Sequence, residues 1–230
     1  MHLKTSESKY ISGIKKTFSS HANPNNAVPM KRYMKDQFEF FGIQSKQRRD
    51  LQREFMKKET LPLLDQIEGI IKELWALPQR EFQYFGMELL EKYVNKGDKE
   101  IVTLFEYMIL NKSWWDTVDM IAARLVGPVF RRYNELIVPY TEKWMYYGNM
   151  WLQRSAILFQ LKYKKNTDIE LLFNYIQALA DSKEFFIQKA LGWVLREYSK
   201  TDPKAVVEFV KSTQLAPLSR KEALKVINRG

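Results

Sequence analysis

Apolar residues recur along almost the whole chain at the spacing of amphipathic helices, which gives most segments one apolar and one polar face. Tyr10, Ile11, Ile14 and Phe18 form the first such pattern, which we expect to end in a loop at residues 23–26. Further helices are predicted over residues 30–40, 46–58, 63–75, 80–94, 99–110, 114–125, 137–146, 150–162, 168–179, 184–198, 203–212 and 220–227. No run alternates between apolar and polar residues as a strand does, so the pattern predicts an all-α protein.

Residues that favour helix ends mark several of these predicted helices. Pro29 suits the first turn of a helix, while Gly42 and the pair Gly127-Pro128 are expected to end one. The predicted N-terminal signals are Ser45, Asp98, Thr167 with Glu170, Asp202 before Pro203, and Ser219 with Glu222. We expect four glutamates, Glu73, Glu81, Glu88 and Glu91, to be exposed charges on helix surfaces.

The helical pattern also repeats at an offset of 35 residues. This offset aligns Phe82-Gln83, Leu152-Gln153 and Ile187-Gln188, with Thr117-Val118 in the remaining position. Paired antiparallel helices at such a period are typical of an α-α superhelix, a solenoid of HEAT-like repeats. We therefore predict one domain over residues 1–230, in which the second helix of each pair lines a concave basic groove.

The same register groups the unusual side chains. Asp119, Arg154 and Lys189 occupy one position of three successive repeats, and Trp115, Met150 and Phe185 occupy another, one helical turn earlier. In the helix predicted over residues 184–198, the face opposite the apolar stripe carries Phe185, Lys189, Trp193 and Arg196. Exposed aromatic side chains beside cations are typical of binding surfaces, so this wall is predicted to bind a charged polymer.

Trp115 and Asp119 are four residues apart, so on a helix their side chains lie one above the other. The apolar stripe of the same helix is Val118, Ala122 and Leu125, which leaves the pair at its edge. One interpretation is a half-buried tryptophan next to a solvated carboxylate. The other is a catalytic carboxylate next to an aromatic face.

The composition narrows the possible partners. The chain of 230 residues is 45% apolar, contains no cysteine and carries a formal charge of +10, with a pI of about 9.5. The absence of cysteine fits a cytoplasmic protein, and neither a signal peptide nor a membrane-spanning run is recognisable. The charge favours a polyanion such as nucleic acid, although ribosome-associated and membrane-surface proteins share it.

The sequence lacks the residues needed for several common types of catalytic and cofactor-binding site. The two histidines, His2 and His21, lie near the N-terminus, and no phosphate-binding glycine loop occurs. We therefore expect no metal and no cofactor. What remains is a single carboxylate in an aromatic, cationic groove, an arrangement able to stabilise a positively charged sugar carbon.

Three long blocks carry a resemblance to a known family: KSWWDTVD at 112–119, WLQRSAILFQLKY at 151–163 and SKEFFIQKALGWVLREY at 182–198. RYMK at 32–35 and GIQ at 42–44 match as well. On these blocks the chain resembles the AlkD-like alkylpurine DNA glycosylases over nearly its whole length.

The resemblance implies roles for particular residues. It makes Asp119 the catalytic carboxylate and places Trp115 and Trp193 on either side of the deoxyribose of the lesion. The remaining expected DNA contacts are Arg154 at a phosphate, Tyr33, Phe185 and Phe186 around the same cleft, and Gln44 and Lys189.

The expected activity is removal of cationic N-alkylated purines from double-stranded DNA by a monomeric enzyme. Such a base has a weakened glycosidic bond, so the enzyme need only stabilise the sugar cation and place a water molecule. The family is thought to act without flipping the base into a pocket. Two alternatives stay open, a non-catalytic module that binds damaged or branched DNA and a HEAT-type protein scaffold.

Overall fold

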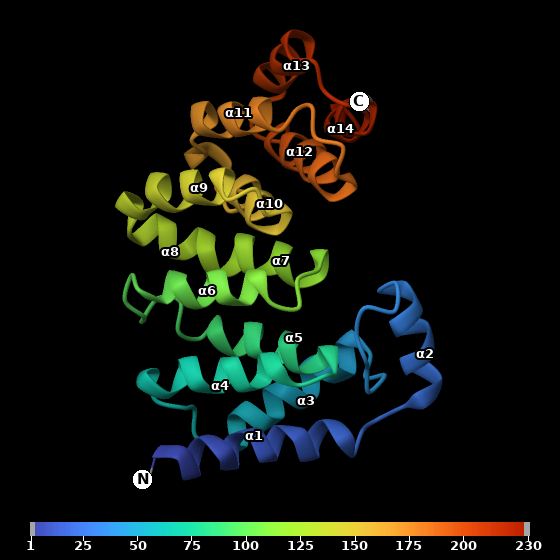
Figure 1. Cartoon of the computed structure of the whole chain (residues 1–230), viewed down its shortest axis with the longest axis vertical. Coiled ribbons are helices and arrows are strands. Elements are labelled where there is room, and N and C mark those ends of the chain that lie inside the picture. The colour runs from blue at the N-terminus through green and yellow to red at the C-terminus, as the bar shows by residue number, and fades with distance from the viewer. Residues whose placement is uncertain (1–2, 228–230) are drawn as a thin grey trace. The chain divides into compact units, whose positions relative to one another are not determined.

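Helices make up most of residues 3–227, the part of the chain that the computed structural model describes, and they form two units (Figure 1). Unit 1 ends at Gly97 and contains α1 (Leu3–Ser19), α2 (Pro24–Tyr33), α3 (Ser45–Lys58), α4 (Leu64–Ala76) and α5 (Arg80–Leu90). Unit 2 begins at Asp98 and contains α6 (Ile101–Leu110), α7 (Trp115–Ile121), α8 (Gly127–Arg132), α9 (Ile137–Tyr146), α10 (Met150–Leu158), α11 (Ile169–Ala178), α12 (Phe185–Tyr198), α13 (Pro203–Ser212) and α14 (Pro217–Ala223). No strand occurs between residues 3 and 227, so the predicted all-α class is confirmed.

The predicted spacing of 35 residues appears in the structure as the spacing of helix starts. The first residues of α5, α7, α10 and α12 are Arg80, Trp115, Met150 and Phe185, each 35 positions after the last. Within unit 2, α10 lies between α7 and α12 (Figure 1). Equivalent repeat positions in unit 2 are therefore neighbours in space.

The recurring glutamine of the repeat has a structural role. Gln83 donates from Nε2 to the carbonyl oxygens of Leu74 at 2.9 Å and Leu77 at 3.1 Å. Gln153 donates to Met145 at 3.2 Å, and Gln188 donates to Ser182 at 2.9 Å. Each side chain thus satisfies backbone carbonyls in the preceding helix or in the loop after it, where intrahelical partners run out.

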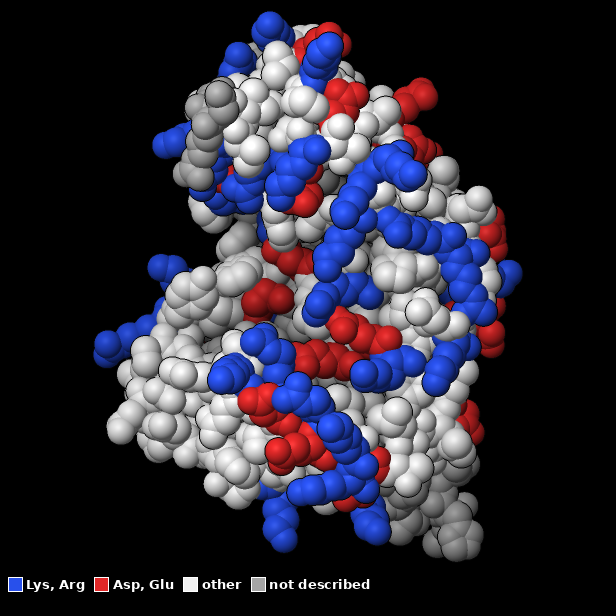
Figure 2. Space-filling model, turned by 180° about the vertical axis from the view of Figure 1, so that it is seen from behind, with Lys and Arg blue, Asp and Glu red and all other residues white. Residues whose placement is uncertain are grey.

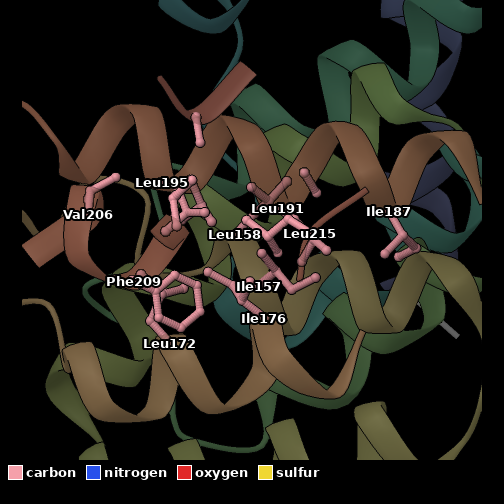
Figure 3. Close-up of a cluster of buried hydrophobic side chains, with 14 of the residues drawn as sticks. Ile157, Leu158, Leu172, Ile176, Ile187, Leu191, Leu195, Val206, Phe209 and Leu215 are labelled. Carbon is pink, nitrogen blue, oxygen red and sulfur yellow. The ribbon is translucent and has the colours of Figure 1, made fainter. Parts of the chain in front are cut away.

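Side chains from the C-terminal helices form a continuous hydrophobic core in unit 2 (Figure 3). Ile157 of α10, Ile176 of α11, Leu191 of α12 and Val206 of α13 are all almost fully buried within it. This core fixes the position of α12, which carries several of the predicted site residues. Among the described residues, no helix has both the length and the apolarity needed to cross a membrane.

The prediction for residues 23–40 was wrong. The segment 23–26 was expected to be a loop, but Asn23 is the N-cap of α2, accepting from the Asn25 N–H at 3.1 Å. Proline directly after a capping asparagine begins a helix as readily as it makes a turn. The helix then ends at Tyr33, because Lys35 and Asp36 adopt positive φ angles of 56° and 58°.

Gly127-Pro128 does not end a helix, contrary to expectation. After α7 the backbone runs through a π-helical segment, Ala122–Val126, and continues directly into α8. The N–H of Gly127 bonds to Ala122 O, five residues back. A Cβ at Gly127 would lie 2.5 Å from the Phe159 carbonyl oxygen. Glycine is therefore needed here for close helix packing, not to end a helix.

Only part of the predicted capping is seen. Asp202 caps α13 as expected, through the Ala205 N–H at 2.9 Å. Asp168, rather than Thr167, caps α11. The remaining predicted caps were wrong. The N-caps of α3, α6 and α14 are Gln44, Glu100 and Ala216, in place of the predicted Ser45, Asp98 and Ser219. Several predicted C-terminal ends were too late as well, those at residues 94, 162 and 227.

Glu81 is fully buried, so its expected exposure was wrong. Its carboxylate accepts the backbone N–H groups of Phe41 at 3.1 Å, Gly42 at 3.0 Å and Ile43 at 3.2 Å. Burial raises the pKa of this carboxyl, although the backbone N–H of Glu81 itself and these three backbone donors oppose the shift. Glu81 of α5 therefore fixes the position of residues 41–43, the segment that precedes α3.

Glu81→Ala should destabilise the protein by about 4 kcal/mol, because it leaves three buried backbone donors without an acceptor. Urea unfolding followed by circular dichroism measures the change. Glu73→Ala is the matched control: Glu73 pairs with Lys15 at 3.4 Å on the surface, and its loss should cost less than about 1 kcal/mol. Equal effects of the two substitutions would contradict the role given to Glu81.

Candidate functional site

Asp119 and Arg154, which share one repeat position, form an ion pair between α7 and α10. Arg154 Nε donates to Asp119 Oδ1 at 2.6 Å, and a terminal guanidinium nitrogen of Arg154 donates to Oδ2 at 2.9 Å. The third nitrogen donates to the carbonyl oxygen of Phe186 in α12. One guanidinium thus joins three neighbouring helices, and it binds Asp119 with the planar bidentate geometry in which arginine binds carboxylates.

Burial and pairing act on Asp119 in opposite directions. Its side chain is 16% exposed, and that of Arg154 is 5% exposed. Burial raises the pKa of Asp119, and the hydrogen bonds and charge of Arg154 lower it less than burial raises it. Asp116, one turn earlier on α7, adds a small further increase. The site therefore holds a partly desolvated carboxylate whose charge depends on Arg154.

An aromatic cluster lies at the N-terminal ends of α7, α10 and α12. The rings of Trp114 and Trp151 have centroids 5.8 Å apart, and each contacts Phe186, at 5.2 Å and 5.0 Å respectively. Phe185 packs edge-on against Phe186 and is 57% exposed. The cluster includes the ring of Phe186, whose backbone carbonyl oxygen binds Arg154, and it reaches solvent at Phe185.

The two tryptophans with predicted catalytic roles are both half-buried. Trp115 is the first residue of α7, one turn before Asp119. Trp193 packs partly against the hydrophobic core of unit 2. The predicted stripe of Val118, Ala122 and Leu125 is fully buried, whereas Trp115 and Asp119 are partly exposed, as expected for positions at its edge.

Lys189 forms an ion pair with Glu222 of α14. Its Nζ donates to Glu222 Oε2 at 2.9 Å, and Arg196 donates to Glu222 Oε1. Glu222 was expected to cap a helix together with Ser219, which was wrong: α14 begins earlier, and Ser219 Oγ donates to Gln188 O at 2.9 Å.

Tyr33 and Gln44 belong to unit 1. Tyr33 ends α2 and is 70% exposed, and Gln44 is an exposed residue at the N-cap of α3. Their predicted contact with DNA remains a prediction, as does the contact of Arg154 with a phosphate. Figure 2 shows that Lys and Arg side chains are interleaved with Asp and Glu on the face opposite that of Figure 1.

Sequence reasoning missed three residues of this region. Trp114 and Trp151 flank Phe186, but helical spacing alone did not set them apart from core residues. Glu222 lies 33 positions after Lys189 and belongs to a different helix, so no local pattern pairs the two. Among the described residues, no group of three or more His, Asp or Glu side chains is arranged to hold a metal ion.

Comparisons with known proteins agree on one family. A family model described as DNA alkylation repair enzyme matches residues 14–227. A solved structure titled as a predicted DNA alkylation repair enzyme from Enterococcus faecalis superposes with a TM-score of 0.84 and 32% sequence identity. The match covers 91% of this chain and 98% of that one. No curated protein matches at a significant level.

Arg154→Ala should destabilise the protein by about 3 kcal/mol at neutral pH, because it leaves a largely buried carboxylate without its partner. Without the lowering effect of Arg154, the pKa of Asp119 should rise further above its ordinary value. Protonated Asp119 does not need the arginine, so the stability difference between variant and wild type should grow as the pH rises from about 4 to 7.

Urea unfolding at several pH values measures this difference. Arg220→Ala is the control, because Arg220 makes a single 3.4 Å contact with the Val210 carbonyl oxygen and should show little pH dependence. A difference for Arg154→Ala that stayed constant over this pH range would mean that Asp119 does not control the effect.

Proposed function

The chain belongs to the DNA alkylation repair enzyme family, and on this premise we propose that it is a DNA glycosylase for cationic N-alkylated purines. The substrates would be bases such as 3-methyladenine and 7-methylguanine in duplex DNA. The reaction is hydrolysis of the N-glycosidic bond, in which water adds to C1′ of the deoxyribose and the base leaves. The product is an abasic site, and no cofactor is required.

The observation that carries this proposal is the position of Asp119. It is a largely buried but not fully enclosed carboxylate, held by Arg154 between helices whose N-terminal ends carry aromatic rings. Loss of a cationic purine leaves positive charge on the sugar, and a fixed negative charge stabilises that transition state. The half-buried indoles of Trp115 and Trp193 offer π faces that attract the same charge.

The bidentate bond with Arg154 does not use up the carboxylate. An ionised carboxylate has about four lone-pair sites, and the two hydrogen bonds from Arg154 take one on each oxygen. A second site on each oxygen is left for a water molecule or for the sugar. Arg154 would then keep Asp119 ionised and fixed in orientation. The carboxylate would therefore need no reorganisation during the reaction.

The same ion pair favours a second function, a non-catalytic module that binds damaged DNA. In that case Asp119 would serve only to hold Arg154 and thereby α7, α10 and α12 together. The two functions differ in what happens when the charge of Asp119 is removed, so substitution at this position separates them.

Asp119→Asn should retain binding to duplex DNA and lose at least about 100-fold in excision of 7-methylguanine, as expected for one preorganised electrostatic group. Excision is measured as abasic sites formed in an oligonucleotide that carries the lesion. Asp116→Asn, three residues earlier on α7, is the matched control and should excise at close to the wild-type rate. Thermal unfolding must show both variants folded at the assay temperature.

Excision by Asp119→Asn within a few-fold of wild type would reject the catalytic role of this carboxylate. No excision by the wild-type protein, together with tight binding to the lesion duplex, would instead support the binding module.

The charge of the lesion, rather than its shape, should decide what is excised. Asp119 and two indoles stabilise only the sugar cation, by a few kcal/mol, and supply no acid to protonate a leaving base. Duplexes with 3-methyladenine, 7-methylguanine, uracil or hypoxanthine in one sequence context test this. The first two should be released and the last two retained, and efficient release of uracil would contradict the mechanism.

A further inference from the structure

Helix α14 packs unusually closely on α12. A Cβ at Gly192 of α12 would lie 2.5 Å from Glu222 Cβ and 2.7 Å from the carbonyl oxygen of Ser219. Ser219 Oγ also donates to the backbone of α12, at Gln188 O. Because Gly192 has no side chain, Glu222 comes within reach of the cations on α12.

Glu222 binds two of these cations at once. Lys189 Nζ lies 2.9 Å from Oε2, and Arg196 donates to Oε1. The carboxylate is 11% exposed, whereas Lys189 and Arg196 keep 37% and 24% of their side chains exposed. The two cations therefore reach solvent, but each is tied to a carboxylate that is largely shielded from water and salt.

These cations belong to the part of α12 that carries the aromatic residues of the candidate site. Phe185, Lys189 and Trp193 follow one another at intervals of four residues, so they share one helix face. Lys189 was expected to contact DNA. Its bond to Glu222 means that a phosphate would have to compete with a carboxylate already in place.

We propose that Glu222 limits the positive charge that α12 presents to DNA phosphates, holding Lys189 and Arg196 so that neither neutralises a phosphate in the complex with undamaged DNA. This inference rests on DNA being the partner but not on glycosylase activity. Its consequence is weak sequence-independent binding, which leaves the protein free to move between sites. Undamaged duplex would thus be released faster than an uncompensated cationic face would allow.

The test is the salt dependence of binding to an undamaged duplex, measured by fluorescence anisotropy for the wild-type protein and for Glu222→Gln. Each cation released to a phosphate steepens the slope of log affinity against log salt by about 0.9, so the variant should gain between about 0.9 and 1.8. It should also bind more tightly at low salt. A merely structural role of Glu222 predicts weaker binding with an unchanged slope.

Glu106→Gln is the matched control. Glu106 is also a largely buried carboxylate of unit 2, 14% exposed, and it binds Lys143 at 2.8 Å. Its substitution changes the net charge by the same amount but frees a lysine of α9 rather than the two cations of α12. The slope for Glu106→Gln should equal that of the wild type. A gain as large as that of Glu222→Gln would show that only net charge matters, and would overturn the proposal.

Lys189→Gln gives a second measurement, and in the wild-type background this measurement does not depend on the folding of the Glu222 variant. In the wild-type background it should leave the slope unchanged, and in the Glu222→Gln background it should remove about 0.9. A decrease of about 0.9 in the wild-type background would show that Lys189 already contacts a phosphate, which overturns the inference. Failure of the wild-type protein to bind duplex DNA would refute the DNA partner itself.

Discussion

The candidate site depends on the balance between desolvation of Asp119 and its pairing with Arg154. Burial alone would favour the protonated acid, which has no charge to offer a developing cation. The bidentate arginine opposes that effect, and it also binds the backbone of α12 at Phe186. The charge of the carboxylate and the packing of α7, α10 and α12 are therefore set by the same guanidinium.

The sequence predicted much of this arrangement because the relevant signals repeat. The 35-residue register located the starts of α7, α10 and α12, and it put Asp119 and Arg154 at equivalent positions. Neighbouring repeats stack, so equivalent positions become neighbours, and the ion pair follows from that geometry. The pairing itself was not predicted, because helical spacing within one helix says nothing about partners on the next.

The residues that the sequence did not predict act between elements far apart in the chain. Glu81 was expected to be an exposed helix charge, and Glu222 was expected to cap a helix together with Ser219. One binds the backbone of a segment 38 to 40 residues earlier, and the other binds cations on α12. Gly127 likewise resembled a helix end, but its role is to admit the Phe159 carbonyl oxygen. Contacts of this kind depend on tertiary packing, which local patterns do not encode.

The π-helical segment Ala122–Val126 follows Asp119 by three residues and has a consequence for the length of chain between Asp119 and α8. A π turn accommodates one residue more than an α-helical turn without breaking the helix, so it is the structural equivalent of a single-residue insertion. Removing one residue there would restore regular α-helical geometry, and the helix beyond would keep its orientation, because the wider turn absorbs the extra residue locally. The number of residues between Asp119 and α8 can therefore change by one without changing the face that α8 presents to its neighbours.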